Sequence, residues 1–257
     1  HLSLRRQRQM CIRDRLRTTK AFWWTTGLIF VIITLSTLIM SLNAQEAVLG
    51  VSPLQASTLG AAIIFLGVPI MMIQGIMVVT TEYSHKTQTI TYLANPHRWS
   101  VAVAKLVLYG AIAALIAFFG LVYIFVLADS TTNASAAEAF RPFSDDNAKR
   151  MLWTYPLEAF GIVLFGQALG LLLRQTSGAV ALALIWYLAL ENAIMFLPRV
   201  GEKIVDYLPI TALNRWLNNS VPDTVPWDSP GISALIFFVW AIVLWIIGVI
   251  LLEKRDA

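Results

Sequence analysis

Residues Val101 to Leu127 read VAVAKLVLYGAIAALIAFFGLVYIFVL, and Lys105 carries the only charge in this stretch. An α-helix rises about 1.5 Å per residue, and the hydrocarbon core of a bilayer is about 30 Å thick, so about 20 apolar residues can cross it. In lipid, only helices and closed barrels satisfy all backbone polar groups. The stretch therefore predicts a transmembrane helix.

Five other stretches are comparably long and apolar. The chain is 58% hydrophobic and 13% charged, with a mean hydropathy of +0.69. Soluble proteins average about 45–50% apolar and about 25% charged residues. The sequence thus predicts an all-α membrane protein with six transmembrane helices and excludes an ordinary soluble domain. The other five predicted spans are Phe22 to Leu42, Leu59 to Thr80, Pro156 to Leu173, Ala179 to Leu197 and Ile232 to Leu252.

The first fifteen residues differ in character from the rest. The chain opens with His1, and Arg5 to Arg15 resembles translated sequencing-adapter sequence. We expect residues 1–15 to be non-native and residues 16–257 to form the membrane domain; a genuine basic cytoplasmic arm is the alternative. Residues 1–15 carry five Arg and one Asp, which equals the net charge of +4 of the whole chain. The positive net charge of the chain therefore gives no support for nucleic-acid binding.

The basic residues of the short loops predict the orientation. Six spans put both ends of the membrane domain on one side, and short cytoplasmic loops are enriched in Lys and Arg. The first opposing loop, Asn43 to Ser57, has neither. We therefore expect both termini to be cytoplasmic. The basic residues on the predicted inner side are Arg17, Lys20, Lys86, Arg98, Lys105, Arg174, Lys254 and Arg255.

Two longer segments fall on the predicted outer side. Ala128 to Tyr155 contains small and polar residues and is expected to be a loop. Pro198 to Pro230 alternates apolar and polar residues and contains Pro209. It predicts short re-entrant helices between the fifth and sixth spans, or interfacial helices anchored by Trp216 and Trp227.

An amphipathic segment joins the second and third spans. On a helix, Tyr83, Ile90 and Leu93 would share one face, and Pro96 would end the element. Glu82 and Lys86 have the favourable i,i+4 order. The segment predicts a short helix at the inner membrane surface, whose simplest role is to lie on lipid head groups.

Several polar or helix-modifying residues lie at predicted membrane depth. Polar groups there usually face a bundle interior or a water-filled cavity. Glu191 is the most costly to bury, so either it lines a substrate route or gate, or it has a structural role in which it pins the fifth helix to a neighbour or reaches the outer interface near Arg199. Pro69 is expected to kink the second helix. Gly166 and Gly170 permit close helix packing, either within one subunit or between two. The candidates for a substrate path or gate are Gln74, Gln167, Glu191, Asn192 and Pro209.

The inner segment also carries a resemblance. Glu82-Tyr83, Thr87, Thr89, Leu93, Pro96, Arg98 and Lys105 resemble the cytoplasmic segment of the type-2 permeases of ATP-binding-cassette (ABC) exporters. In that family this segment is the coupling helix, which docks into a separate ATPase. The resemblance implies that this chain contacts its ATPase through Glu82, Tyr83, Thr87, Ile90, Leu93, Pro96 and Arg98.

The resemblance extends over nearly the whole chain through individually loose motifs. Leu16 to Lys20 with Trp23-Trp24 is similar to the entry into the first helix, and Gly166 to Arg174 to the hairpin between helices four and five. Leu208-Pro209 with Ala212-Leu213 is similar to the external re-entrant region. Lys86 departs from the pattern, which commonly has glycine there.

No catalytic motif accompanies these features. The sequence has no Gly-xxxx-Gly-Lys-Ser/Thr loop, no His-Glu-x-x-His and no Gly-x-Ser-x-Gly. We therefore expect no enzyme activity, metal or cofactor in this chain, and the resemblance implies that ATP and Mg are bound by a partner ATPase.

The sequence thus predicts a multi-pass permease subunit of a bacterial ABC exporter in the cell membrane. The resemblance implies a second permease copy, or a close relative, and an ABC ATPase as partners, with lipid around them and no nucleic acid. The alternative is an ATP-independent secondary transporter or channel that uses Glu191 for proton coupling. No motif identifies the substrate.

Overall fold

The computed structural model describes residues 20–43, 55–84, 98–132, 143–198, 201–221, 223 and 225–255. Within these ranges the chain is helical with turns, and no strand occurs. Residues 1–15 and the predicted coupling residues Thr87, Ile90, Leu93 and Pro96 lie outside the described residues.

In the described part of the chain, six helical segments are long and apolar enough to cross a membrane, which supports a multi-pass membrane protein and agrees with the six predicted spans. Spans two and five each contain a π-helical turn, named η1 and η2. The spans are α2 (Lys20–Leu42); α3 (Ala56–Ala62), η1 (Ile63–Gly67) and α4 (Val68–Ser84); α6 (Arg98–Thr131); α8 (Asp146–Leu173); α9 (Thr176–Ile185), η2 (Trp186–Leu190) and α10 (Glu191–Met195); and α13 (Pro230–Arg255).

Helix α8 is the central element of the bundle and packs against α4, α6 and α13. Glycines make these contacts close. A Cβ atom on Gly166 would lie 2.8 Å from the carbonyl oxygen of Met72, and one on Gly170 would lie 3.4 Å from that of Ile76. Both glycines therefore allow close packing against α4 within this chain, as the single-subunit interpretation of their spacing predicts.

The second span is interrupted just before Pro69. Proline has no N–H to donate and crowds the preceding turn, so it disturbs a helix on its N-terminal side. The disturbance takes the form of the π-helical turn Ile63–Gly67, directly before α4. π-Helical turns are an established cause of helix bending.

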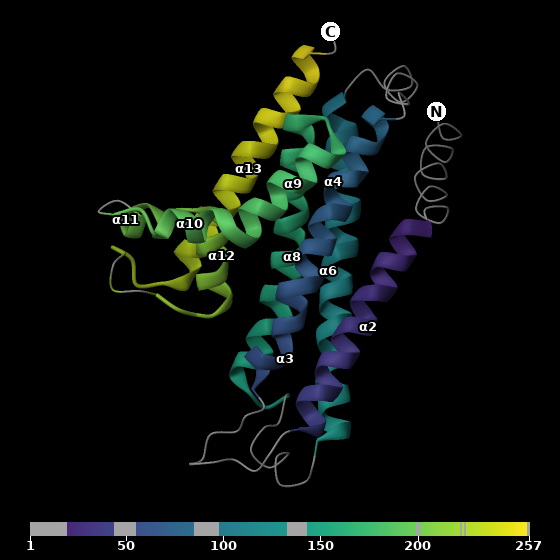
Figure 1. Ribbon diagram of the computed structural model, residues 1–257, viewed down its shortest axis with the longest axis vertical. Coiled ribbons are helices and arrows are strands. Elements are labelled where there is room, and N and C mark those ends of the chain that lie inside the picture. The colour runs from purple at the N-terminus through teal and green to yellow at the C-terminus, as the bar shows by residue number, and fades with distance from the viewer. Residues whose placement is uncertain are drawn as a thin grey trace.

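The ends of the spans gather in two groups (Figure 1). The Ser84 end of α4, the start of α6, the α8–α9 turn and the Arg255 end of α13 lie together, and we call this the α8–α9 end. The Leu42 end of α2, the start of α3, the Thr131 end of α6 and the start of α8 lie at the other end, here the α3 end. A hydrogen bond of 2.7 Å from Thr131 Oγ1 to Ser41 Oγ joins α6 to α2 there.

The prediction that Ala128 to Tyr155 forms a loop is wrong in part. Helix α6 continues to Thr131 and α8 begins at Asp146, so residues 146–155 are helical. Asp145 is the N-cap and accepts a hydrogen bond of 3.1 Å from the Ala148 backbone N–H, which satisfies one of the free donors of the first turn. Pro156 therefore lies inside the helix and does not begin it.

Two short helices, α11 (Gly201–Val205) and α12 (Pro209–Leu217), connect the fifth span to the sixth. Figure 1 shows α10 and α11 beside the bundle, crosswise to α8. The π-helical turn η2 separates the steep helix α9 from α10, and it lies where the fifth span changes direction.

Candidate functional site

The predicted polar residues do not form one cluster. Gln74 Nε2 donates a hydrogen bond of 2.6 Å to Thr25 Oγ1, which links α4 to α2. Asn192 is exposed, and its Nδ2 donates to the Leu188 carbonyl within the same span. Gln167 is completely buried in α8 without a hydrogen-bond partner among the residues described. Of these three side chains, only Gln74 hydrogen-bonds to another helix.

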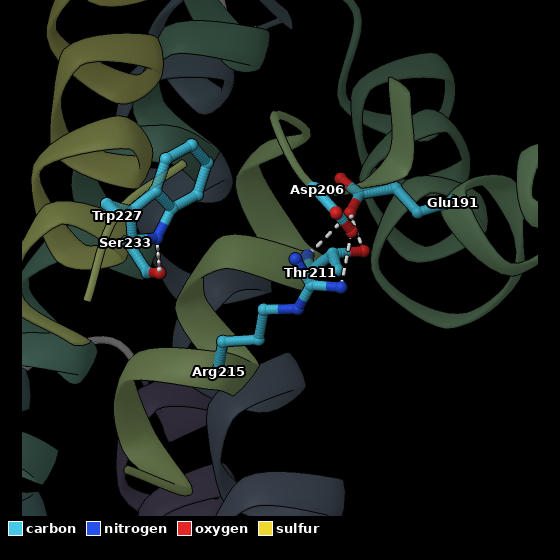
Figure 2. A network of polar contacts seen from close by, with 6 residues as sticks. All are labelled: Glu191, Asp206, Thr211, Arg215, Trp227 and Ser233. Atoms are coloured by element: carbon cyan, nitrogen blue, oxygen red, sulfur yellow. Dashed lines mark hydrogen bonds and ion pairs between the residues drawn. The ribbon is translucent and has the colours of Figure 1, made fainter. Parts of the chain in front are cut away.

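Glu191 is buried, with 4% of its surface exposed, and both of its carboxylate oxygens accept hydrogen bonds; Figure 2 shows those from Thr211. Oε1 accepts hydrogen bonds of 2.9 Å from Trp186 Nε1 and 2.9 Å from the Ile210 backbone N–H. Oε2 accepts bonds of 2.6 Å from the Thr211 backbone N–H and 2.7 Å from Thr211 Oγ1. Four donors therefore surround this carboxylate.

These bonds make Glu191 an N-terminal cap supplied by a different helix. Ile210 and Thr211 follow Pro209 in the first turn of α12, where backbone N–H groups lack partners within the helix. A helix N-terminus also attracts negative charge. Because α10 carries Glu191, the cap attaches the fifth span to α12, and this is the structural one of the two roles that the sequence leaves open.

The other end of α12 is held by a cation from the fourth span. Arg150 of α8 donates a hydrogen bond of 2.8 Å from Nη1 to the Leu217 carbonyl oxygen and a second from Nη2 to that of Trp216. A helix C-terminus favours positive charge and has free carbonyls. We call Glu191 and Arg150 together the α12 clamp, since they complement the helix dipole at both ends.

Further polar contacts secure the same region. Asp206, which is 3% exposed, pairs with Arg215 of α12. Trp227 Nε1 donates a 3.3 Å hydrogen bond to Ser233 Oγ of α13 (Figure 2). Trp240 of α13 donates a 2.9 Å bond to the Tyr207 carbonyl. Helix α12 is thus connected to spans four, five and six.

The sequence gives only partial signals for these residues. Arg150 falls in the predicted outer loop because Pro156 is the expected start of the span, although the Asp145 N-cap and the acidic Asp146 after it are typical of a helix start. Asp206 has no local pattern that pairs it with Arg215. The partner of each residue is set by the tertiary fold.

Glu158 is a second buried carboxyl, inside the predicted fourth span. It is 1% exposed, and neither oxygen has a hydrogen-bond partner among the residues described. An acid in a predicted span is itself a signal of a functional position. Gln167 follows nine residues later, which puts it on the opposite face of α8, so these two polar groups do not share one site.

The α8–α9 end holds the described part of the predicted coupling segment. Tyr83 lies near the end of α4, and the Arg174 guanidinium carbon is 5.3 Å from the centre of its ring. Arg174 Nη2 also donates a 2.9 Å hydrogen bond to the Leu251 carbonyl of α13. Glu82 belongs to α4 and Arg98 begins α6, and their side chains lie outside the described part.

No group of three or more His, Cys, Asp or Glu in the described part of the chain could hold a metal ion. The chain matches no protein-family model and no curated protein.

Proposed function

We propose that this chain is the membrane-spanning subunit of a bacterial ABC exporter in the cell membrane, with both termini in the cytoplasm. A separate ATPase binds ATP and Mg and drives alternating access of the permease to the two sides. Six apolar spans and the resemblance of Glu82 to Arg98 to a coupling helix support this proposal.

The observation that carries the proposal is the junction at Arg174. A coupling helix must transmit movement to several spans. Arg174 lies against Tyr83, which belongs to the first part of the proposed coupling segment, and is bonded to Leu251 of the last span.

The backbone at Arg174 makes this junction compact. Its φ of 53° is left-handed, and its N–H bonds to the Gly170 carbonyl at 2.9 Å, which ends α8 abruptly. Helix α9 begins two residues later, at Thr176, whose hydroxyl donates a 2.9 Å bond to Thr80 of α4. Displacement of the α4 end would therefore act on α8, α9 and α13 together.

In this proposal α11 and α12 are the re-entrant outer region, and α10 is the end of the fifth span that leads into it. Their support is the crosswise orientation of α10 and α11 beside the spans and the burial of Ile210, Leu213 and Trp216 on α12. The α12 clamp joins this region to spans four and five. A rearrangement of those spans would therefore move these outer helices with them.

A second permease copy or close relative would complete the transporter, as in the family that the sequence resembles. Spans one and five leave most of their apolar side chains exposed or only partly buried, whereas α8 is largely buried. Such apolar helix faces are suited to contact with lipid or with a second permease.

The alternative of an ATP-independent transporter using Glu191 has less support. A proton-coupling acid must exchange its proton during transport, whereas Glu191 has both oxygens engaged with four donors.

Co-purification tests the proposed function. Tagged protein isolated from membranes of its native host in mild detergent is expected to bring with it an ATPase that contains a phosphate-binding loop. Leu93→Asp is expected to reduce the recovered ATPase at least tenfold, because it places a charge on the proposed docking face.

Ser220→Asp is the matched control, because Ser220 is an exposed residue that follows α12 on the opposite side of the proposed topology. It is expected to recover as much ATPase as the wild type. Recovery of stable permease without any ATPase, from cells that express its native partners, would contradict the proposal.

A further inference from the structure

The bundle buries two glutamates in opposite chemical environments. Glu191 has four hydrogen-bond donors on its two oxygens. Glu158 is 1% exposed and has none among the residues described. Burying an ionised carboxylate without donors costs several kcal/mol or more, whereas a neutral acid is far cheaper to bury. The two carboxyl groups therefore require different protonation states.

The contacts of α8 place Glu158 beside the π-helical turn of the second span. A Cβ on Gly60 would lie 2.6 Å from the Tyr155 hydroxyl, and one on Gly166 would lie 2.8 Å from the Met72 carbonyl oxygen. The two helices therefore run in the same direction. Glu158 lies between these two contacts along α8, so it is level with the part of span two, between Gly60 and Met72, that contains η1.

The fifth span meets the same point. The Tyr187 hydroxyl, on η2, donates a 2.9 Å hydrogen bond to the Ile64 carbonyl oxygen. Both π-helical turns of the chain's described spans therefore meet at the level of Glu158. Such turns occur often at functional positions, because they displace side chains and backbone carbonyls from the regular helical pattern.

Spans two and five, which meet at Tyr187 and Ile64, carry no cation here. Of the other elements packed against α8, α6 has Arg98 and Lys105 and α13 has Lys254 toward the α8–α9 end, and Arg215 of α12 pairs with Asp206. Residues 55–81 of span two contain no titratable side chain, and residues 176–195 of span five contain only Tyr187 and Glu191. On α8 itself, Tyr155 lies one turn before Glu158 on the same side of the helix. Glu158 interacts electrostatically with two phenols, those of Tyr155 and Tyr187.

We propose that Glu158 is a proton-binding site in the interior of the bundle, occupied when spans two, four and five pack as they do here. The proton converts the carboxylate to a carboxylic acid, whose neutral form suits a buried position where no described donor is hydrogen-bonded to either oxygen. The proposal stands independently of the exporter function. A conformation in which spans two and five separate would hydrate this carboxyl and release the proton, so rising pH favours that conformation.

Infrared difference spectroscopy on the purified full-length protein at neutral pH tests the site. The spectrum of wild type minus Glu158→Gln is expected to contain the C=O band of a protonated carboxyl, shifted in D2O. Wild type minus Glu191→Gln is the control and is expected to contain carboxylate bands. Carboxylate bands in the Glu158 difference spectrum would overturn the proposal.

A melting measurement gives a second, independent result. Glutamine has nearly the shape of a neutral glutamic acid, so Glu158→Gln is expected to keep the wild-type Tm, whereas Glu191→Gln lowers it. A loss of Tm from Glu158→Gln as large as that from Glu191→Gln would overturn the proposal. If Glu158→Gln cannot be purified, the difference spectrum against Glu158→Asp identifies the same band, because the two acids absorb at different C=O frequencies.

Discussion

Glu191→Ala is expected to lower the free energy of unfolding by about 3–5 kcal/mol, because the first turn of α12 loses its cap and buried donors lose their acceptor. Trp186 Nε1 and the backbone N–H groups of Ile210 and Thr211 would be left without this carboxylate. Chemical unfolding in detergent, followed by tryptophan fluorescence, measures the change. Trp186 and Trp216 both lie close to the altered region.

Asn192→Ala is the matched control for this prediction. Asn192 is the next residue in α10, but it is exposed and its side chain bonds only to the Leu188 carbonyl one turn earlier. We expect a change within about 0.5 kcal/mol, as for most surface substitutions. Equal effects of the two substitutions would contradict the α12 clamp.

Gly166→Leu is expected to destabilise the bundle by about 3 kcal/mol or more, because over-packing a tight interface forces the helices apart. Even a Cβ atom at this position would approach the Met72 carbonyl oxygen to 2.8 Å, and a backbone carbonyl cannot turn away as a flexible side chain can. The separation of α4 from α8 would also strain the contact between Gly170 and Ile76. The loss of Tm in detergent measures the effect.

Gly27→Leu provides the comparison. A Cβ on Gly27 of α2 would have no heavy atom within 4 Å, so the substitution meets open space. Leucine has a higher helix propensity than glycine by about 0.5–1 kcal/mol, so this variant is expected to be as stable as the wild type or slightly more stable. If Gly166→Leu is equally well tolerated, the close α4–α8 packing is wrong.

The spans are predictable from the sequence because their signal is local. A run such as Val101 to Leu127 is long enough to cross a bilayer in any tertiary context. The extent of α8 is less predictable, since its first ten residues are polar enough for a loop. They are helical because Asp145 caps them and because Met151 and Tyr155 pack beside Gly60 of span two.

The site residues depend more strongly on tertiary structure. Glu191 is recognisable as a costly buried acid, but its partners are the backbone of Ile210 and Thr211, about twenty residues later in the chain. Arg150 and Leu217 are 67 residues apart. No periodicity or motif encodes such pairs. The assignment of Thr87, Ile90, Leu93 and Pro96 to ATPase coupling remains a prediction from the resemblance.

Glu158 illustrates a different limit. Its position inside a predicted span is visible in the sequence, but the absence of donors around it is a property of the packed bundle. The candidates drawn from the sequence include Glu191 and miss Glu158, whereas the structure buries both acids and separates them by their hydrogen bonds.

Side-specific cysteine labelling tests the central claim most directly, namely that the segment after Tyr83 faces the cytoplasm, where an ATPase can act on it. In a Cys11→Ser background, Thr87→Cys is expected to react with a membrane-impermeant maleimide only after the cells are permeabilised. Ser220→Cys is expected to react in intact cells. Labelling of Thr87→Cys in intact cells, with Ser220→Cys protected, would contradict the coupling role and the exporter function with it.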